Sequence, residues 1–181
     1  MRANFGAWAA RWRVPLGFIF AIVYAAASRP TPALLAVGGA VTLAGLALRG
    51  FAAGCIDKDQ KLATAGPFRY TRNPLYLGSF ILGGGFMIAG GSLTLSGAFA
   101  ALFFMIYIPV MRQEETTMRH RFGSAYQNYA AKTPLFLPRL PRAAGNGGRF
   151  RWKQYWKNRE YEAAAGWMLA TLLLITKLLL P

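Results

Sequence analysis

Long apolar runs separated by short polar segments are the dominant pattern along this chain. Four of these runs are predicted to form helices: Val14–Ala27, Pro32–Leu48, Leu75–Gly91 and Leu93–Met111. The hydrocarbon core of a bilayer is about 30 Å thick, and roughly 20 apolar residues in a helix cross it. The first run reaches that length only if Trp12 and Arg13 lie at the interface. The pattern therefore predicts at least four membrane-spanning helices.

A fifth apolar run, Ala163–Leu180, carries a single charge, Lys177, close enough to its end for the ammonium group to reach the interface. Little more than Gly90-Gly91-Ser92 separates the third and fourth runs, which indicates a tight helical hairpin. A proline-rich turn at 29–32 joins the first two runs in the same way. We therefore expect an all-α, polytopic integral membrane bundle of four to five transmembrane helices.

Small residues recur at positions that would bring membrane helices together. Ala36, Ala40 and Ala44 lie four residues apart in the second run, and this spacing lets two helix backbones approach closely. We expect this face to pack against a neighbouring helix rather than to form a ligand groove. Three successive glycines at 83–85 either serve the same purpose or leave room for a ligand, and the sequence favours neither.

After the fourth run the character of the chain changes. Apolar and aromatic residues recur at helical spacing within Thr116–Lys132, which indicates an amphipathic helix on the membrane surface. Residues 143–148 are typical of a flexible linker, and 149–159 alternate basic with aromatic residues, as interfacial anchors do. We therefore divide the chain into a membrane domain at 1–141 and a basic-aromatic linker with a C-terminal transmembrane helix at 142–181.

The basic residues are distributed very unevenly. The chain has 21 Lys and Arg against 6 Asp and Glu, a net charge of +15. On the expected topology 19 of the 21 lie on one side of the membrane, and only Arg29 and Lys177 lie on the other. This is the positive-inside pattern, so we expect a cytoplasmic N-terminus in the inner or plasma membrane of a bacterium. The charge then indicates contact with the lipid bilayer, and no nucleic acid partner is expected.

Single residues limit the metal and redox chemistry. Cys55 is the only cysteine and His120 the only histidine. The chain therefore has no internal disulfide and no multi-cysteine or multi-histidine metal site, and we expect no metal.

Two polar segments are hard to explain as membrane scaffold. Residues 66–78 read Gly-Pro-Phe-Arg-Tyr-Thr-Arg-Asn-Pro-Leu-Tyr-Leu-Gly. The second segment begins with Glu114-Glu115 and continues as Phe-Gly-x-x-Tyr-x-x-Tyr from residue 122. Adjacent carboxylates near a helix end repel each other and need a cationic partner. That partner is either a ligand or one of three arginines, Arg69, Arg72 and Arg112.

These two segments resemble the integral membrane methyltransferases that include isoprenylcysteine carboxyl methyltransferases and phospholipid N-methyltransferases. The resemblance covers roughly residues 50–140 and leaves 142–181 outside. Asn73 stands where the carboxyl methyltransferases usually have His, whereas phospholipid methyltransferases and many bacterial relatives have Asn. The resemblance therefore supports the superfamily more firmly than a prenylcysteine acceptor.

The resemblance implies an enzyme that uses S-adenosyl-L-methionine to methylate a membrane lipid or a lipid-linked acceptor, on a carboxylate oxygen or an amine nitrogen. It also implies a cofactor site on the cytoplasmic side. The residue chemistry agrees, because a carboxylate pairs with the cofactor's cationic groups and aromatic rings offer π faces. Arg112, which would orient an anionic headgroup, and Glu115 are the catalytic candidates. By position the cofactor-binding candidates are Gln60, Lys61, Leu62, Ala63, Phe68, Asn73, Pro74, Leu75, Tyr76 and Glu114.

Two other classes of function remain open at this point. A small transporter or channel would need polar groups near the bilayer midplane, and the first four apolar runs carry no charge there. A non-catalytic membrane scaffold could keep the form of the family without its chemistry. Binding of the cofactor would separate the enzyme from both.

Overall fold

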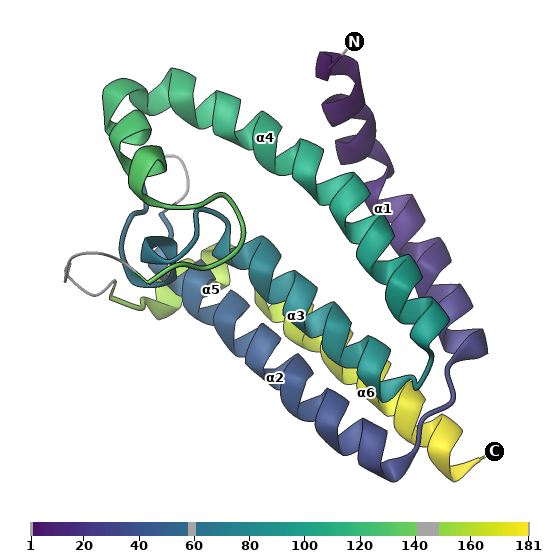
Figure 1. Cartoon of the computed structure of the whole chain (residues 1–181). Coiled ribbons are helices and arrows are strands. Elements are labelled where there is room, and N and C mark those ends of the chain that lie inside the picture. The colour runs from purple at the N-terminus through teal and green to yellow at the C-terminus, as the bar shows by residue number, and fades with distance from the viewer. Residues whose placement is uncertain (1, 58–60, 141–148, 181) are drawn as a thin grey trace.

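The computed structural model describes residues 2–57, 61–140 and 149–180. Every regular element in these ranges is helical, so the expected all-α class is confirmed. Figure 1 shows the helices as elongated rods, with the short turns at 28–31 and 90–92 at one end of the bundle and the irregular segments 61–73 and 133–140 at the other. In chain order the elements are α1 (Arg2–Ala27), α2 (Pro32–Cys55), the 3-10 helix η1 (Gly66–Arg69), α3 (Pro74–Ala89), α4 (Leu93–Lys132), α5 (Trp152–Lys157) and α6 (Tyr161–Leu179).

Three helices, α2, α4 and α6, are long and apolar enough to cross a membrane, and α3 is a shorter apolar helix of 16 residues. The chain is therefore an integral membrane helical bundle. Helix α1 begins at Arg2 rather than at Val14, and it packs against α4, where Ala9, Ile106 and Val110 form a buried apolar cluster. Since α1 and α3 fall outside the long apolar set, the exact number of spans stays a prediction.

Helices α2 and α3 are in very close contact along their glycine-bearing faces. A Cβ atom on Gly85 would lie 2.5 Å from the backbone nitrogen of Thr42 and 2.7 Å from the carbonyl oxygen of Gly38. Only glycine allows two helix backbones to come this near. The expectation that the Ala36, Ala40 and Ala44 face makes this contact is wrong, because those three alanines are exposed. Glycine residues form the interface instead, because they lack the methyl group that alanine would place between the two backbones.

The turns at 28–31 and 90–92 and the C-terminal end of α6 lie together at one end of the bundle (Figure 1). The backbone nitrogen of Arg29 donates to the carbonyl oxygen of Gly90 at 2.8 Å. The Lys177 ammonium group donates to the carbonyl oxygens of Ala25 and Ser28 at 2.7 and 2.8 Å, so it caps the C-terminal end of α1. The two basic residues assigned to the external side are thus at the same end of the bundle.

Cysteine labelling tests the orientation of the bundle. Cys55 would first be replaced by Ser, and single cysteines then placed at Ser92 and Ser124 in separate variants. A thiol reagent that cannot cross the membrane should label Ser92→Cys in intact cells, because the basic residues retain the opposite end in the cytoplasm. It should label Ser124→Cys only after permeabilisation. The reverse pattern would contradict the cytoplasmic placement of the polar end.

Helix α4 extends beyond the apolar run and carries the amphipathic segment that the sequence predicts. Gly123 has a φ of 52° and a ψ of −127°, so the helix axis breaks there. The positive φ is one that glycine adopts without strain. This break turns the final part of α4 back over the polar end of the bundle, as Figure 1 shows.

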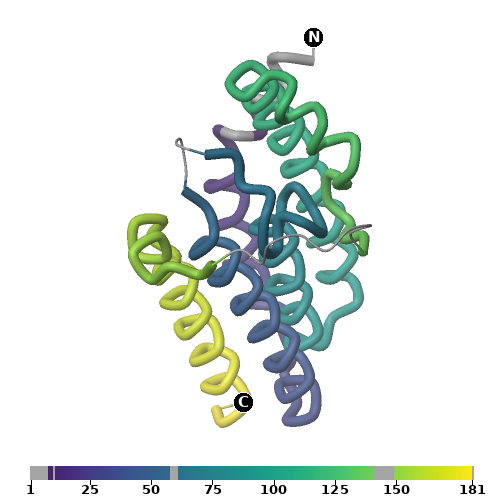
Figure 2. Tube along the Cα trace, turned by 90° about the vertical axis from the view of Figure 1, so that its left-hand side faces the viewer, coloured from purple at the N-terminus to yellow at the C-terminus, as the bar shows by residue number. Residues whose placement is uncertain are grey.

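The C-terminal segment lies along α2 in both Figure 1 and Figure 2. The indole nitrogen of Trp167 donates to the Thr42 hydroxyl at 2.9 Å, which ties α6 to the middle of α2. Residues 149–159, expected as an anchor, include the short helix α5. The division of the chain at 141/142 stays a prediction.

Candidate functional site

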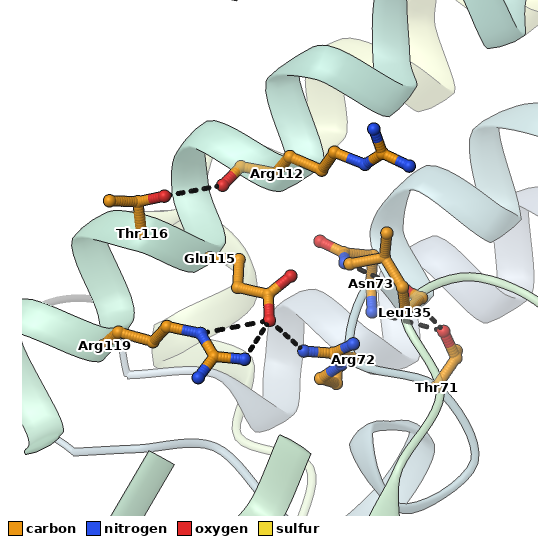
Figure 3. Close-up of polar contacts among 8 residues, drawn as sticks. All are labelled: Thr71, Arg72, Asn73, Arg112, Glu115, Thr116, Arg119 and Leu135. Atoms are coloured by element: carbon orange, nitrogen blue, oxygen red, sulfur yellow. Dashed lines mark hydrogen bonds and ion pairs between the residues drawn. The ribbon is translucent and has the colours of Figure 1, made fainter. Parts of the chain in front are cut away.

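Hydrogen bonds join the two polar segments singled out in the sequence. The backbone nitrogen of Arg72 donates to the carbonyl oxygen of Pro134 at 2.9 Å. The carbonyl oxygen of Leu135 accepts from the Asn73 amide at 2.9 Å and from the Thr71 hydroxyl at 3.3 Å (Figure 3). Because both segments are irregular here, these bonds satisfy backbone groups that no helix pairs. The loop before α3 and the chain after α4 therefore form one unit.

The loop before α3 is built around a single buried ring. Gly66 has a φ of 60°, which suits glycine, and it starts the η1 turn that leaves Phe68 only 5% exposed. The Tyr129 hydroxyl donates to the carbonyl oxygen of Phe68 at 2.7 Å. Burial raises the pKa of Tyr129, so this hydroxyl keeps its proton and remains a donor. The final turn of α4 thus holds the Phe68 ring in place.

Helix α3 begins with Pro74 at its first turn, which suits proline because it has no N–H to leave unpaired there. This start places the Tyr76 hydroxyl against α4, where it donates to an oxygen of Glu114 at 2.6 Å. The Tyr76 ring also packs on Tyr107, with ring centres 5.2 Å apart. Glu114 is exposed on α4, and no ion pair to its carboxylate forms within the described residues.

Glu115 has a different environment from its neighbour. One of its oxygens accepts from Arg72 at 2.7 Å and from Arg119 at 2.8 Å (Figure 3). Burial disfavours the ionised carboxylate, but the hydrogen bonds from Arg119 and Arg72 outweigh it and hold the pKa of Glu115 below its usual value. The ion pairs are therefore complete at neutral pH and are lost only as the pH falls below the usual carboxylate range.

The sequence left open whether the cationic partner of these two carboxylates is a ligand or an arginine of the protein. The structure gives a different answer for each carboxylate. Arginines of the protein neutralise Glu115, which accounts for one carboxylate structurally. Glu114 accepts a hydrogen bond from the Tyr76 hydroxyl instead and forms no ion pair with a described residue. Of these two carboxylates, Glu114 is therefore the one with which a cationic ligand can pair.

A cavity of about 550 Å³ opens between the loop before α3, the start of α3 and the latter part of α4. Every described residue that was expected to bind the cofactor lines this cavity, and Glu115 lines it too. Gln60 lies outside the described residues. The roles of the lining residues stay predictions, although their convergence from separate segments is a structural fact. The expected binding residues on the wall are Lys61, Leu62, Ala63, Phe68, Asn73, Pro74, Leu75, Tyr76 and Glu114.

Arg112 is placed differently. Its side chain is exposed and is not among those that line the cavity. Figure 3 shows the guanidinium group extending away from the Glu115 carboxylate, while its carbonyl oxygen accepts from Thr116 at 3.1 Å. No contact in the structure supports its role in orienting an acceptor, and that role stays a prediction.

Sequence reasoning missed four polar residues on the cavity wall: Arg49, Asp57, Asn158 and Glu160. Arg49 had a usable signal, because it is a charge near the end of a long apolar run. Asn158 and Glu160 had only a weak one, a polar cluster just before the last apolar run. Both residues lie outside the stretch that the resemblance covers, so the sequence assigned them no role.

The cavity fits the cofactor that the resemblance implies. Its volume lies within the range of roughly 300–1,000 Å³ usual for cofactor and ligand sites. The wall combines the Glu114 carboxylate with the aromatic rings of Phe68, Tyr76 and Tyr126. S-adenosylmethionine has a sulfonium and an ammonium for the carboxylate and an adenine for an aromatic face.

Comparison with known families gives an independent result. The sequence pattern of the phospholipid methyltransferase family matches residues 33–125, just over half of the chain. That stretch contains Asn73, Glu114 and Glu115. It ends before Asn158 and Glu160. No solved structure matches the chain at a significant level.

Three curated relatives match parts of the chain. The nickel-cobalt-cadmium resistance protein NccN of Alcaligenes xylosoxydans xylosoxydans is 35% identical over 83 residues, which cover 46% of this chain and 38% of the relative. The cobalt-zinc-cadmium resistance protein CzcN of Cupriavidus metallidurans is 32% identical over 140 residues, or 71% of this chain and 62% of the relative. The protein-S-isoprenylcysteine O-methyltransferase of Schizosaccharomyces pombe is 29% identical over 85 residues, or 47% of this chain and 36% of the relative. The chain thus spans less than two thirds of each of them.

Proposed function

This chain belongs to the phospholipid methyltransferase family, within the superfamily of integral membrane methyltransferases, and we propose that it transfers a methyl group from S-adenosyl-L-methionine to a lipid or lipid-linked acceptor. One observation carries the proposal. The Glu114 carboxylate, which forms no ion pair with any residue that the structure describes, lies in one cavity with Phe68, Asn73 and Tyr76. A cavity of this kind suits a cationic, aromatic cofactor.

Glu114 and its neighbours would hold the cofactor. When bound, S-adenosylmethionine supplies a methyl group made electrophilic by the sulfonium. The carboxylate of Glu114 binds the positive charge, and the Tyr76 hydroxyl fixes the carboxylate's direction by its 2.6 Å hydrogen bond. Phe68 and Tyr126 are the aromatic residues of the wall that would contact the adenine or the cationic groups. The Asn73 side-chain nitrogen donates a hydrogen bond to the carbonyl oxygen of Leu135, which fixes the orientation of the side chain. The amide oxygen of Asn73 can then accept a hydrogen bond from a ligand.

Glu115 acts on the shape of the site. Its carboxylate ties Arg72 in the loop to Arg119 on α4, so it holds the two walls of the cavity at a fixed separation. Methyl transfer from a sulfonium needs alignment and exclusion of water more than a catalytic base. Met118 and Phe122 supply apolar cover on the α4 side. The chain's residues therefore bind, orient and desolvate.

The acceptor would enter from the bilayer, because its apolar chains gain nothing by crossing water. A second, smaller hollow of about 200 Å³ lies between α1, α3 and α4 and is lined by Phe20, Phe99, Phe103 and Tyr107. The Tyr107 ring packs on Tyr76, so this apolar hollow ends beside the main cavity. It is a route for a hydrocarbon chain from the membrane to the site.

Lateral entry has a measurable consequence. For acceptor analogues with one headgroup and increasing acyl or prenyl length, methylation efficiency should rise steeply with chain length, since each buried CH₂ is worth about 0.8 kcal/mol. The measurement is kcat/KM for a chain-length series in detergent at fixed protein concentration. Equal efficiency for a short water-soluble analogue and its long-chain counterpart would contradict entry from the bilayer.

Equilibrium binding of radiolabelled cofactor to the purified protein tests the proposed function. Saturable binding, displaced by the demethylated cofactor product S-adenosylhomocysteine, is expected of a methyltransferase. A small transporter or a non-catalytic scaffold would show no such binding. Absence of saturable binding by folded protein would therefore refute the proposal.

A further inference from the structure

The wall of the cavity has an unusual share of the chain's acidic residues. The chain carries 21 basic and 6 acidic residues, yet four of the six carboxylates line this one cavity. They are Asp57, Glu114, Glu115 and Glu160. Two of them belong to ion pairs whose guanidinium groups also line the cavity. Each guanidinium on the wall therefore has a carboxylate partner.

The pair formed by Arg49 and Glu160 lies at the α2 end of the cavity. The Arg49 Nε donates to one oxygen of Glu160 at 2.6 Å, and its Nη2 donates to the other at 3.1 Å. Glu160 is 5% exposed. This two-point geometry uses both carboxylate oxygens and is the strongest form of an arginine–carboxylate contact. The guanidinium is thus occupied on the side that faces the C-terminal segment.

The remaining nitrogen of Arg49 is also committed. Its Nη1 donates to the Ser79 hydroxyl and lies 3.5 Å from the carbonyl oxygen of Leu75, both on α3. Arg49 therefore bridges α6 and the start of α3. With Glu160 in place, its charge is not available to a ligand in the cavity.

The turn that carries Glu160 is held firmly on the end of α2. The Asn158 amide donates to the carbonyl oxygens of Ala53 and Ile56 at 2.8 and 3.3 Å. These carbonyls belong to the C-terminal end of α2, where a helix leaves acceptors unpaired. Arg159 takes a φ of 55°, which is costly for a residue with a side chain and shows that the surrounding contacts impose this turn.

From this arrangement we propose that Glu160 is a specificity-determining residue of the site: by holding Arg49 it keeps a guanidinium from an anionic acceptor group and favours acceptors that are neutral or zwitterionic. The inference rests on the proposed function and deepens it. Segment 149–180 then completes the active site, although it lies outside the stretch that matches the family. An acceptor headgroup with a net negative charge would need a free guanidinium there to offset that charge, and Glu160 already occupies the Arg49 guanidinium.

Competitive lipid binding to the full-length protein tests this inference. Purified protein in detergent would be mixed with equal amounts of phosphatidylethanolamine and phosphatidylglycerol of identical acyl chains, and native mass spectrometry would give the ratio of the two bound lipids. Glu160→Gln frees the Arg49 guanidinium while conserving the size of the side chain. Both headgroups contain a phosphate, but only in phosphatidylethanolamine does an ammonium group offset its charge. A free guanidinium therefore favours the net anionic headgroup, and the ratio should shift toward phosphatidylglycerol by at least about threefold.

Three other variants make the result specific. Glu162→Gln removes an exposed carboxylate of the same segment and should leave the ratio unchanged. The double variant Arg49→Gln with Glu160→Gln removes both charges and should return to the wild-type ratio. Glu160→Asp keeps the charge and should stay near wild type. If Glu160→Gln fails to fold, an elevated ratio in either of the last two variants still overturns the inference.

An unchanged lipid ratio in folded Glu160→Gln would also overturn the inference. The ion pair between Arg49 and Glu160 would then have a structural role only. Binding of labelled S-adenosylmethionine is measured on the same wild-type sample. Absence of cofactor binding in the wild type refutes the proposed function. Cofactor binding in the wild type together with an unchanged lipid ratio in Glu160→Gln refutes only the role of Glu160.

Discussion

Glu114→Gln should weaken binding of S-adenosylmethionine by roughly 10- to 100-fold. The substitution removes a charge-assisted contact of about 1.5–3 kcal/mol from a carboxylate that forms no ion pair within the described part of the chain. Glutamine keeps the length of the side chain and can still accept from the Tyr76 hydroxyl, so the local structure should survive. The measurement is equilibrium binding of labelled cofactor to purified protein in detergent.

The matched control is Glu162→Gln, a carboxylate exposed at the start of α6 and paired with Arg159. It should bind the cofactor as the wild type does. If Glu114→Gln binds within about twofold of the wild type, the carboxylate does not hold the cofactor's charge, and the site would have to be reassigned.

Gly85→Ala should destabilise the bundle by at least about 1–3 kcal/mol, the usual cost of forcing an extra carbon into a packed interface. The added methyl group would lie 2.5 Å from the backbone nitrogen of Thr42 and 2.7 Å from the backbone oxygen of Gly38, neither of which can rotate aside. The adjacent Gly84 has nothing within 4 Å of its own Cβ position. Gly84→Ala should therefore be neutral or slightly stabilising, because alanine favours a helix more than glycine does.

Thermal unfolding of the two variants in one detergent gives the comparison. The variants differ by one position in the same helix, so helix propensity and detergent effects cancel. Equal melting temperatures for Gly84→Ala and Gly85→Ala would show that the α2–α3 contact is looser than described.

The helical pattern could be predicted because it depends on local composition and length. Long apolar runs specify helices in a bilayer. The face used for packing could not be predicted in the same way. The spacing of Ala36, Ala40 and Ala44 suits helix packing. Glycine allows a still closer approach of two backbones, however, and the α2–α3 contact is formed by Gly38 and Gly85.

Part of the candidate site could also be anticipated. The motif around Asn73 and the Glu114-Glu115 pair identified two segments, and the structure joins them in one cavity. The sequence could not show that Glu115 pairs with arginines whereas Glu114 accepts from the Tyr76 hydroxyl, because both glutamates have arginines nearby in sequence. Glu160 could not be anticipated either, because its partner Arg49 is 111 residues away and the sequence shows no periodicity that links them.

Methyl transfer into membrane lipid tests the central claim most directly. Purified wild-type protein and Glu114→Gln would each be incubated with methyl-labelled S-adenosylmethionine and a total lipid extract, and the label in the organic phase would be followed over time. The account predicts that label accumulates in a lipid with the wild type and falls by at least about tenfold with Glu114→Gln under subsaturating cofactor. A folded, cofactor-saturated wild-type protein that leaves every lipid unlabelled would contradict it.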